Sequence, residues 1–256
     1  MTRLAVALVT LWLGIMPQIA AAQSCRLALV LGLDVSLSVN TFDFDLQRGG
    51  LAGALTDDAV TDAILGTPGH HIELAVFEWS GQYNQNLLLD WTIVETRQQL
   101  DRIARTLRSE PQGLRSGRTA IGAAMLYARN KLRERPHCAS WTLDISGDGP
   151  NNNGTAPEDL RAKMHAAGII VNGLVIEPEQ RPQEASYEGS LSDYFRANVI
   201  VGPASFVQTI TGFKAYKEAI TRKLLRELLP AIAQDTPALR PGPTVDTAPY
   251  RPRPRG

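Results

Sequence analysis

Short apolar runs alternate with longer amphipathic stretches along most of this chain, and this alternation restricts its possible folds more than any other feature. Runs typical of strands lie at residues 26–33, 72–78, 87–92, 140–145, 169–176 and 205–209. Helical patterns separate most of them, at residues 42–65, 95–108, 119–133, 155–167 and 213–229. The order predicts an α/β fold with a Rossmann-like, doubly wound, mostly parallel six-stranded sheet that carries helices on both faces.

Local signals refine this expected sheet. The run at 87–92 follows the preceding run after only a polar turn, so we expect an antiparallel strand at one edge. Asn40 is a suitable N-cap for the first helix. The pair Gly49-Gly50 is expected to break that helix, because glycine lowers helix stability.

The first 22 residues have the pattern of an export signal. Arg3 is followed by an apolar stretch at 4–15 and by alanines that end at Ala22, the expected cleavage point. That stretch is short for a bilayer, so we expect a mature chain with no membrane span that is periplasmic or secreted. The folded domain is then expected at 23–232, and the Pro- and Arg-rich residues 233–256 form a predicted disordered tail.

Charge argues against one class of partner. The 256 residues contain 26 Lys and Arg against 26 Asp and Glu, so the formal net charge is zero. Proteins that bind nucleic acid neutralise phosphates with a basic face, and aromatic platforms stack bases. Aromatic residues make up only 6% of this chain. We therefore expect no nucleic-acid partner.

Five oxygen-bearing side chains lie just after expected strands or at the start of an expected helix. The first apolar run ends at Asp34, and Ser36 and Ser38 follow at alternate positions. Thr119 begins a helical pattern, and Asp148 follows the run at 140–145 between two glycines. Carboxylates and hydroxyls are hard ligands that suit Mg²⁺ or Mn²⁺. At strand ends Asp is also common as a turn or capping residue, which is the alternative interpretation.

With these segments in this order, residues from about 25 to 229 resemble the von Willebrand factor type A domain family. That family's metal-ion-dependent adhesion site uses Asp-x-Ser-x-Ser, a Thr from a second loop and an Asp from a third. The resemblance implies one Mg²⁺ or Mn²⁺ ion held by Asp34, Ser36, Ser38, Thr119 and Asp148. It also implies a binding module that engages an exposed acidic residue of a protein partner. Residues 145–152 are similar to an uncharacterised exported bacterial branch of the family.

The resemblance also bears on the two cysteines. Cys25 and Cys138 each lie just before an apolar run. In the family's topology these two strands are parallel neighbours, so the resemblance implies a disulfide at the sheet edge opposite the metal site. Export into an oxidising compartment favours it. Two unconnected small apolar residues are the alternative.

An enzyme is the alternative function. Asp34 could accept a phosphoryl group beside Mg²⁺ at a strand end, in a phosphotransferase or hydrolase. Against this, Ser36 stands where such enzymes often have a second Asp, and no Gly-x-Ser-x-Gly elbow surrounds it. We therefore expect a protein that is not an enzyme.

Four further features keep two interpretations each. Asp144 is either a second acceptor behind the metal ligands or, as we prefer, a structural ion-pair partner. Trp79 is either a contact residue or a packed side chain at the functional edge. The asparagines at 151–153 either hydrogen-bond around the metal loop or form a turn. The acidic segment 177–190 follows a strand end, so it is expected to shape the partner surface or to act as a filter that admits only a protruding acidic side chain flanked by basic ones.

Overall fold

The computed structural model describes residues 24–111, 113, 115–179 and 187–228. The expected export signal and the expected tail lie outside these residues. Six strands are present in the described part: β1 (Ser24–Asp34), β2 (His70–Trp79), β3 (Gln85–Val94), β4 (Ser140–Gly147), β5 (Ile169–Glu177) and β6 (Val207–Thr211). The helices are α1 (Thr41–Leu55), α2 (Asp58–Leu65), α3 (Arg97–Ser109), α4 (Ile121–Arg133), α5 (Glu158–Ala166), α6 (Leu191–Asn198) and α7 (Tyr216–Leu228), with a short 3₁₀ turn, η1 (Phe213–Ala215).

The strands form one sheet in the order β3-β2-β1-β4-β5-β6. Only β3 runs antiparallel to its neighbour, which confirms the predicted antiparallel edge. The predicted fold class and all six predicted strands are therefore confirmed. Parallel strands bring their carboxyl ends to one edge, so the residues after β1, β4 and β5 meet there.

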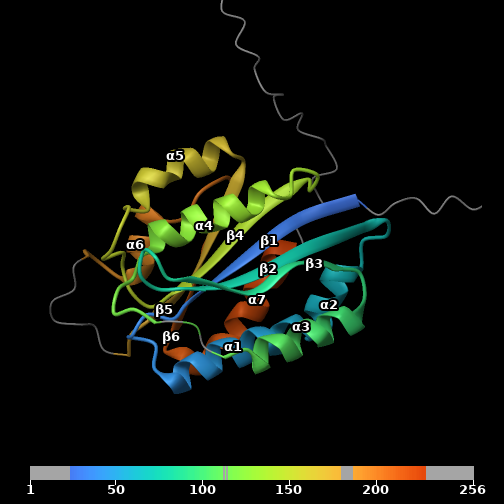
Figure 1. Ribbon diagram of the computed structural model, residues 1–256, viewed down its shortest axis with the longest axis horizontal. Helices are drawn as coiled ribbons and strands as arrows, with labels where there is room; N and C mark the ends of the chain where they lie inside the picture. The colour runs from blue at the N-terminus through green and yellow to red at the C-terminus, as the bar shows by residue number, and fades with distance from the viewer. Residues whose placement is uncertain (1–23, 112, 114, 180–186, 229–256) are drawn as a thin grey trace, which may run out of the picture.

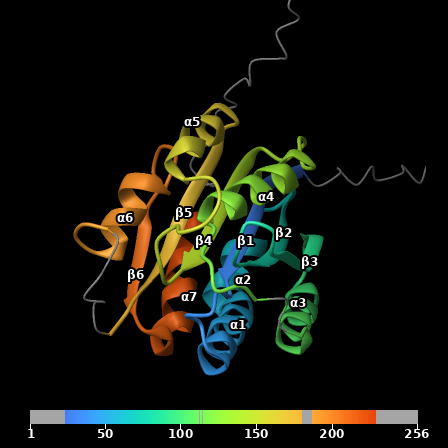
Figure 2. The ribbon, with the colours of Figure 1, turned by 60° about the vertical axis from the view of Figure 1, so that its left-hand side comes forward.

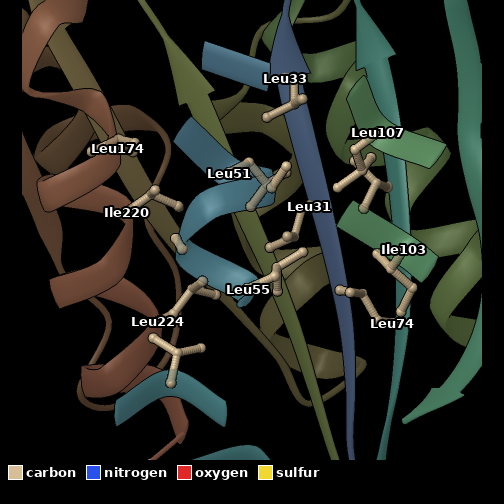
Figure 3. Packing of buried hydrophobic residues seen from close by; sticks show 14 of the residues in the cluster. Leu31, Leu33, Leu51, Leu55, Leu74, Ile103, Leu107, Leu174, Ile220 and Leu224 are labelled. Carbon is tan, nitrogen blue, oxygen red and sulfur yellow. The ribbon is translucent and has the colours of Figure 1, made fainter. Parts of the chain in front are cut away.

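Helices cover both faces of the sheet (Figures 1 and 2), with α1, α2, α3 and α7 on one face and α4, α5 and α6 on the other. Strand β1 is therefore buried on both sides and is apolar almost throughout, as central parallel strands are. Figure 3 shows the first face, where Leu31 and Leu33 of β1 lie against Leu51 and Leu55 of α1.

The predicted break of the first helix was misplaced. Helix α1 continues through Gly49 and Gly50 and ends at Leu55, and Asp57 then caps the start of α2. A Cβ at Gly50 would lie 3.0 Å from the Tyr216 ring of α7. Glycine at position 50 therefore allows α1 and α7 to pack closely, and it does not terminate α1.

The predicted disulfide is present, between Cys25 at the start of β1 and Cys138 just before β4. The Cα atoms are 4.5 Å apart, within the range that a disulfide bridges. The backbone N–H of Ala139 donates to the carbonyl of Cys25 at 2.9 Å, which fixes the two strand starts side by side. The bridge lies at the opposite end of β1 from Asp34.

Candidate metal centre

The loop that follows β1 folds back on its last residue. Asp34 is buried at the strand end, and its Oδ1 accepts a hydrogen bond of 2.8 Å from the backbone N–H of Ser36. This is the local turn that Asp commonly makes with the residue two positions later. The hydroxyls of Ser36 and Ser38 lie 3.0 Å apart. The Asp-x-Ser-x-Ser segment therefore gathers its three side chains at one place.

The loop after β4 reaches the same place. Ser38 donates its hydroxyl to Asp148 Oδ1 at 2.9 Å, although the two residues are 110 positions apart. Thr119 is joined to this loop by a reciprocal pair of hydrogen bonds with Asn152, each 2.8 Å long. The structure thus brings together all five residues that were predicted as metal ligands: Asp34, Ser36, Ser38, Thr119 and Asp148.

The surroundings of Asp34 and Asp148 disfavour the charged forms of their carboxyl groups. Burial and the nearby Asp148 charge raise the pKa of Asp34 to about 8, against hydrogen bonds from Ser36. Burial also raises the pKa of Asp148, with the charge of Asp43 adding to the shift and the Ser38 hydroxyl opposing it. Asp34 Oδ2 is buried and has no hydrogen-bond partner within the described residues. A carboxylate oxygen left unpaired beside a second carboxylate is suited to a divalent cation.

Two residues that support the site, Arg115 and Asp43, were not predicted. The Arg115 guanidinium donates to the backbone carbonyls of Val35 and Ser36, at 3.2 and 3.1 Å, and to that of Val39. It therefore holds the loop in which two of the serines stand. Asp43, in the first turn of α1, adds a third carboxylate near the ligands. No local sequence pattern marks Arg115, because its contacts are 76 to 80 positions away in the chain.

The asparagines 151–153 hydrogen-bond around the loop, which was one of their two interpretations. Asn152 Oδ1 accepts from the Thr119 N–H, and Asn153 Oδ1 accepts from the Gln82 N–H at 2.8 Å. Asn151 Oδ1 accepts from the N–H of Gly122 at 3.3 Å. One short run of amides thus fastens the β4 loop to two other loops at this edge.

The remaining open interpretations are resolved. Trp79 is fully buried, so it is a packed side chain. Asp144 forms an ion pair with Lys223 of α7, which agrees with the preferred structural interpretation. Glu177 accepts hydrogen bonds from the Ser192 N–H and hydroxyl, both 2.8 Å, and so anchors α6, a helix that was not predicted.

A pocket of about 630 Å³ opens beside the five residues. Two exposed apolar side chains, Leu37 and Phe42, stand in its wall and are each 62% accessible. The rest of the wall comes from the end of β5, the chain just after it and the 3₁₀ turn, and includes Ile176, Glu179, Tyr187 and Phe213. The acidic segment was expected on the metal-site edge, and its described ends lie there; Glu184 falls outside the described residues.

A family model described as "Protein of unknown function (DUF1194)" matches residues 24–232. The chain belongs to the DUF1194 family. The match covers the entire described part of the chain, including every residue of the candidate centre. No curated protein matches the sequence.

In fold, this DUF1194 chain is similar to solved structures of von Willebrand factor type A domains and related proteins. Proximal thread matrix protein 1 from the mussel byssus, with a zinc-occupied MIDAS motif, has 14% identity over 81% of this chain and 46% of that chain, with a TM-score of 0.56. A von Willebrand factor type A protein from Catenulispora acidiphila has 13% identity over 80% and 43%, at 0.53. Manganese-loaded TRAP from Plasmodium vivax has 14% identity over 80% and 73%, at 0.51. The chain thus spans under half the length of the first two, and the likeness shows the fold.

Arg115 gives a first testable prediction about this centre. We expect Arg115→Met to weaken Mn²⁺ binding by about 10- to 100-fold, because the Asp-x-Ser-x-Ser loop loses the donors that hold its carbonyls. Isothermal titration calorimetry measures the effect. Arg118→Met is the matched control, since Arg118 is exposed and close in sequence. Equal affinities for the two variants would show that Arg115 does not position the loop.

Proposed function

We propose that this protein is an exported binding module that holds one divalent cation, Mg²⁺ or Mn²⁺, and uses it to bind an acidic side chain of a protein partner. The observation that carries the proposal is the buried Asp34 Oδ2, which has no hydrogen-bond partner among the described residues and lies near Asp148, a residue of the pocket wall. Asp34, Ser36, Ser38, Thr119 and Asp148 would hold the ion, directly or through water.

The bound cation would supply positive charge at an open coordination position, where a partner carboxylate can bind. The protein's own residues do the rest. Burial of Asp34 keeps bulk water from one side of the site, while exposed Ser38 faces the solvent. Metal-loaded structures among the neighbours, one with zinc and one with manganese, support a cation in this fold.

The pocket wall indicates what else the partner carries. Leu37 and Phe42 are large, apolar and exposed beside the ligands, so a partner gains by laying an apolar side chain over them while its acid reaches the ion. Glu179 in the same wall repels acidic surfaces at longer range. We therefore propose a protruding acidic residue flanked by apolar or basic ones.

Export and the non-enzymatic role belong to the same proposal. The signal-like residues 1–22 and the Cys25–Cys138 disulfide support an oxidising location. None of the helices in the described part has the length and apolar character to cross a membrane. An aspartyl nucleophile must reach its substrate, and Asp34 is 1% exposed, which argues against phosphotransfer.

Partner capture tests the proposal. The purified protein is immobilised and exposed to the native exported fraction with Mg²⁺, and then with a chelator. We expect a partner that is retained with Mg²⁺ and released by chelation, and Thr119→Ala should weaken its retention because a ligand is lost. Replacing Glu179, Glu184 and Glu188 by Gln should strengthen retention, whereas Glu95→Gln, exposed just after β3, should not.

One outcome would remove the adhesion mechanism. A partner whose retention survives chelation, Thr119→Ala and the triple Gln substitution recognises another face of the domain. Retention that needs the ion but is unaffected by the Gln substitutions would keep the metal mechanism and reject the repulsive role of the acidic segment.

A further inference from the structure

A lysine of helix α7, Lys223, is buried against the sheet. The Lys223 side chain is 0% exposed, and its Nζ lies 2.7 Å from Asp144 Oδ2 and 2.6 Å from Glu227 Oε1. The two carboxyl side chains are only 2% and 1% exposed. Lysine is almost never fully buried unless it is paired. Here one amine meets two carboxyl groups.

The sheet register and the helix period create this meeting. Asp144 in β4 lies beside Asn172 in β5, on the face that α7 covers. Helix α7 buries an apolar stripe, and Lys223 and Glu227 stand on it at a spacing of one turn. Asn172 donates its amide to Glu227 Oε1 at 2.7 Å, and its Oδ1 accepts from the Phe206 N–H at 3.0 Å.

The charges of this cluster do not balance. Burial and the charge of Glu227 raise the pKa of Asp144 to about 8, against the opposing effect of Lys223. Asp144 Oδ1 and Glu227 Oε2 are buried without a hydrogen-bond partner in the described part of the chain. Two carboxyl groups and one amine in a dry site therefore hold an extra proton or an uncompensated charge. Either state is costly.

We propose that Lys223 and Asp144 condense to form an intramolecular isopeptide bond, with Glu227 as the group that transfers the proton. The neutral amine of Lys223 attacks Cγ of the neutral Asp144 carboxyl group, and an N–C bond forms. Glu227 takes a proton from the nitrogen and passes it to the hydroxyl of the former carboxyl group. The C–O bond breaks, one water molecule leaves, and Glu227 ends as it began. No oxidant or other reactant is required.

Position and environment both favour this step. The reacting groups are held in contact by two packed elements, and such fixed pairs can reach effective concentrations of about 10⁵ M or more. In a low-dielectric site, transfer of a proton from the ammonium group to the carboxylate gives a neutral amine and a neutral carboxyl group. This transfer avoids the cost of burying two charges. The product is a neutral amide in place of a buried ion pair. The lining includes the Phe206 ring, 5.1 Å from Lys223 Nζ, which keeps the site apolar.

Intact-protein mass spectrometry tests the bond. The full chain is expressed, the exported protein is purified, and its disulfide is reduced and alkylated before measurement. We expect a mass about 18 Da below that of the unlinked chain, which corresponds to one water. Trypsin should fail to cleave after Lys223, and a linked peptide pair containing Asp144 and Lys223 should be found.

Variants assign the roles. Lys223→Met and Glu227→Gln should both restore the unlinked mass, the first because it removes the nucleophile and the second because it removes the proton carrier. Lys217→Met is the matched control on the same helix, since Lys217 is exposed, and it should leave the mass deficit unchanged. The wild-type mass is decisive by itself if a variant does not fold.

Three results would overturn the proposal. The first is a wild-type protein with the full unlinked mass. The second is a loss of about 18 Da that maps to Asp148-Gly149, where an Asp-Gly pair can cyclise on its own. The third is a loss of about 17 Da with a peptide pair that joins Lys223 to Asn172, since ammonia then leaves and Asp144 is not the acceptor.

Discussion

We expect removal of the disulfide to lower the free energy of unfolding by about 4 to 5 kcal/mol. The bridge joins residues 113 positions apart and so restricts the unfolded chain. Without it the conformational entropy of the unfolded state increases, which favours unfolding. Both cysteines are buried, and alanine preserves most of that packing. The variant Cys25→Ala with Cys138→Ala should therefore melt about 10 to 20 °C below the wild type, as a domain of this size loses about 2 to 4 °C for each kcal/mol.

Calorimetry and urea denaturation measure this change. Wild-type protein treated with a thiol reductant provides the control, because it should match the double variant without any substitution. The neighbouring polar groups of Glu73 and His137, whose side chains lie 2.6 Å apart, remain intact in both samples. A difference below about 1 kcal/mol between oxidised and reduced protein would show that the bridge adds little beyond the strand pairing around it.

The sheet could be predicted because each strand carries its own signal. Buried parallel strands are short, apolar and separated by helices, so residues 26–33 or 169–176 are recognisable without any knowledge of their neighbours. The first five observed strands extend the predicted runs by one or two residues at one or both ends, and β6 is shifted two residues toward the C-terminus. The ligand set was predicted from the resemblance to the von Willebrand factor type A family, with Asp34 and Asp148 at the ends of expected parallel strands.

Helix ends were harder to predict where tertiary contacts decide them. Gly50 carries a helix-breaking signal in isolation, but the approach of α7 makes glycine the residue that fits in an unbroken helix. Helix α6 has only eight residues, and its N-terminus is held by Glu177 of β5 as well as by its own capping box at Ser190. The capping box is a local pattern, but the contact with Glu177 is not contained in a single-sequence pattern.

The residues that support the site could not be predicted from the sequence for the same reason. Arg115 stands in a loop with no periodicity, and the carbonyls that it binds belong to the β1 loop. Asp144 was recognised as unusual in an apolar strand, but its partner Lys223 is 79 positions away and occupies a stripe that reads as apolar. A buried carboxyl group within an apolar strand indicates that a partner exists, but no local pattern identifies the partner, because the two residues are far apart in the chain.

We expect removal of both predicted ligand carboxylates to abolish cation binding. Wild-type protein should bind one Mn²⁺ or Mg²⁺ per chain, and Asp34→Ala with Asp148→Ala should show no binding by calorimetry, because only neutral hydroxyls remain among the five predicted ligands. Ser38→Ala should weaken binding by only about tenfold, since it removes one neutral ligand. The control Asp62→Ala with Asp159→Ala removes the same charge from exposed helix positions and should bind as wild type does.

The same variants separate a metal site from a structural cluster through stability and pH. With chelator, the double Asp34, Asp148 variant should melt at or above the wild-type temperature, because two buried carboxyl groups that repel each other have been removed. With Mn²⁺, only the wild type should gain stability, in proportion to the ion concentration over its dissociation constant. Its affinity should fall as the pH decreases from 8 to 6, because below a pKa of about 8 the free site holds a proton on Asp34 that the cation must displace. Equal Mn²⁺ binding by the double variant, or tighter binding in acid, would show that these two carboxylates are not the ligands.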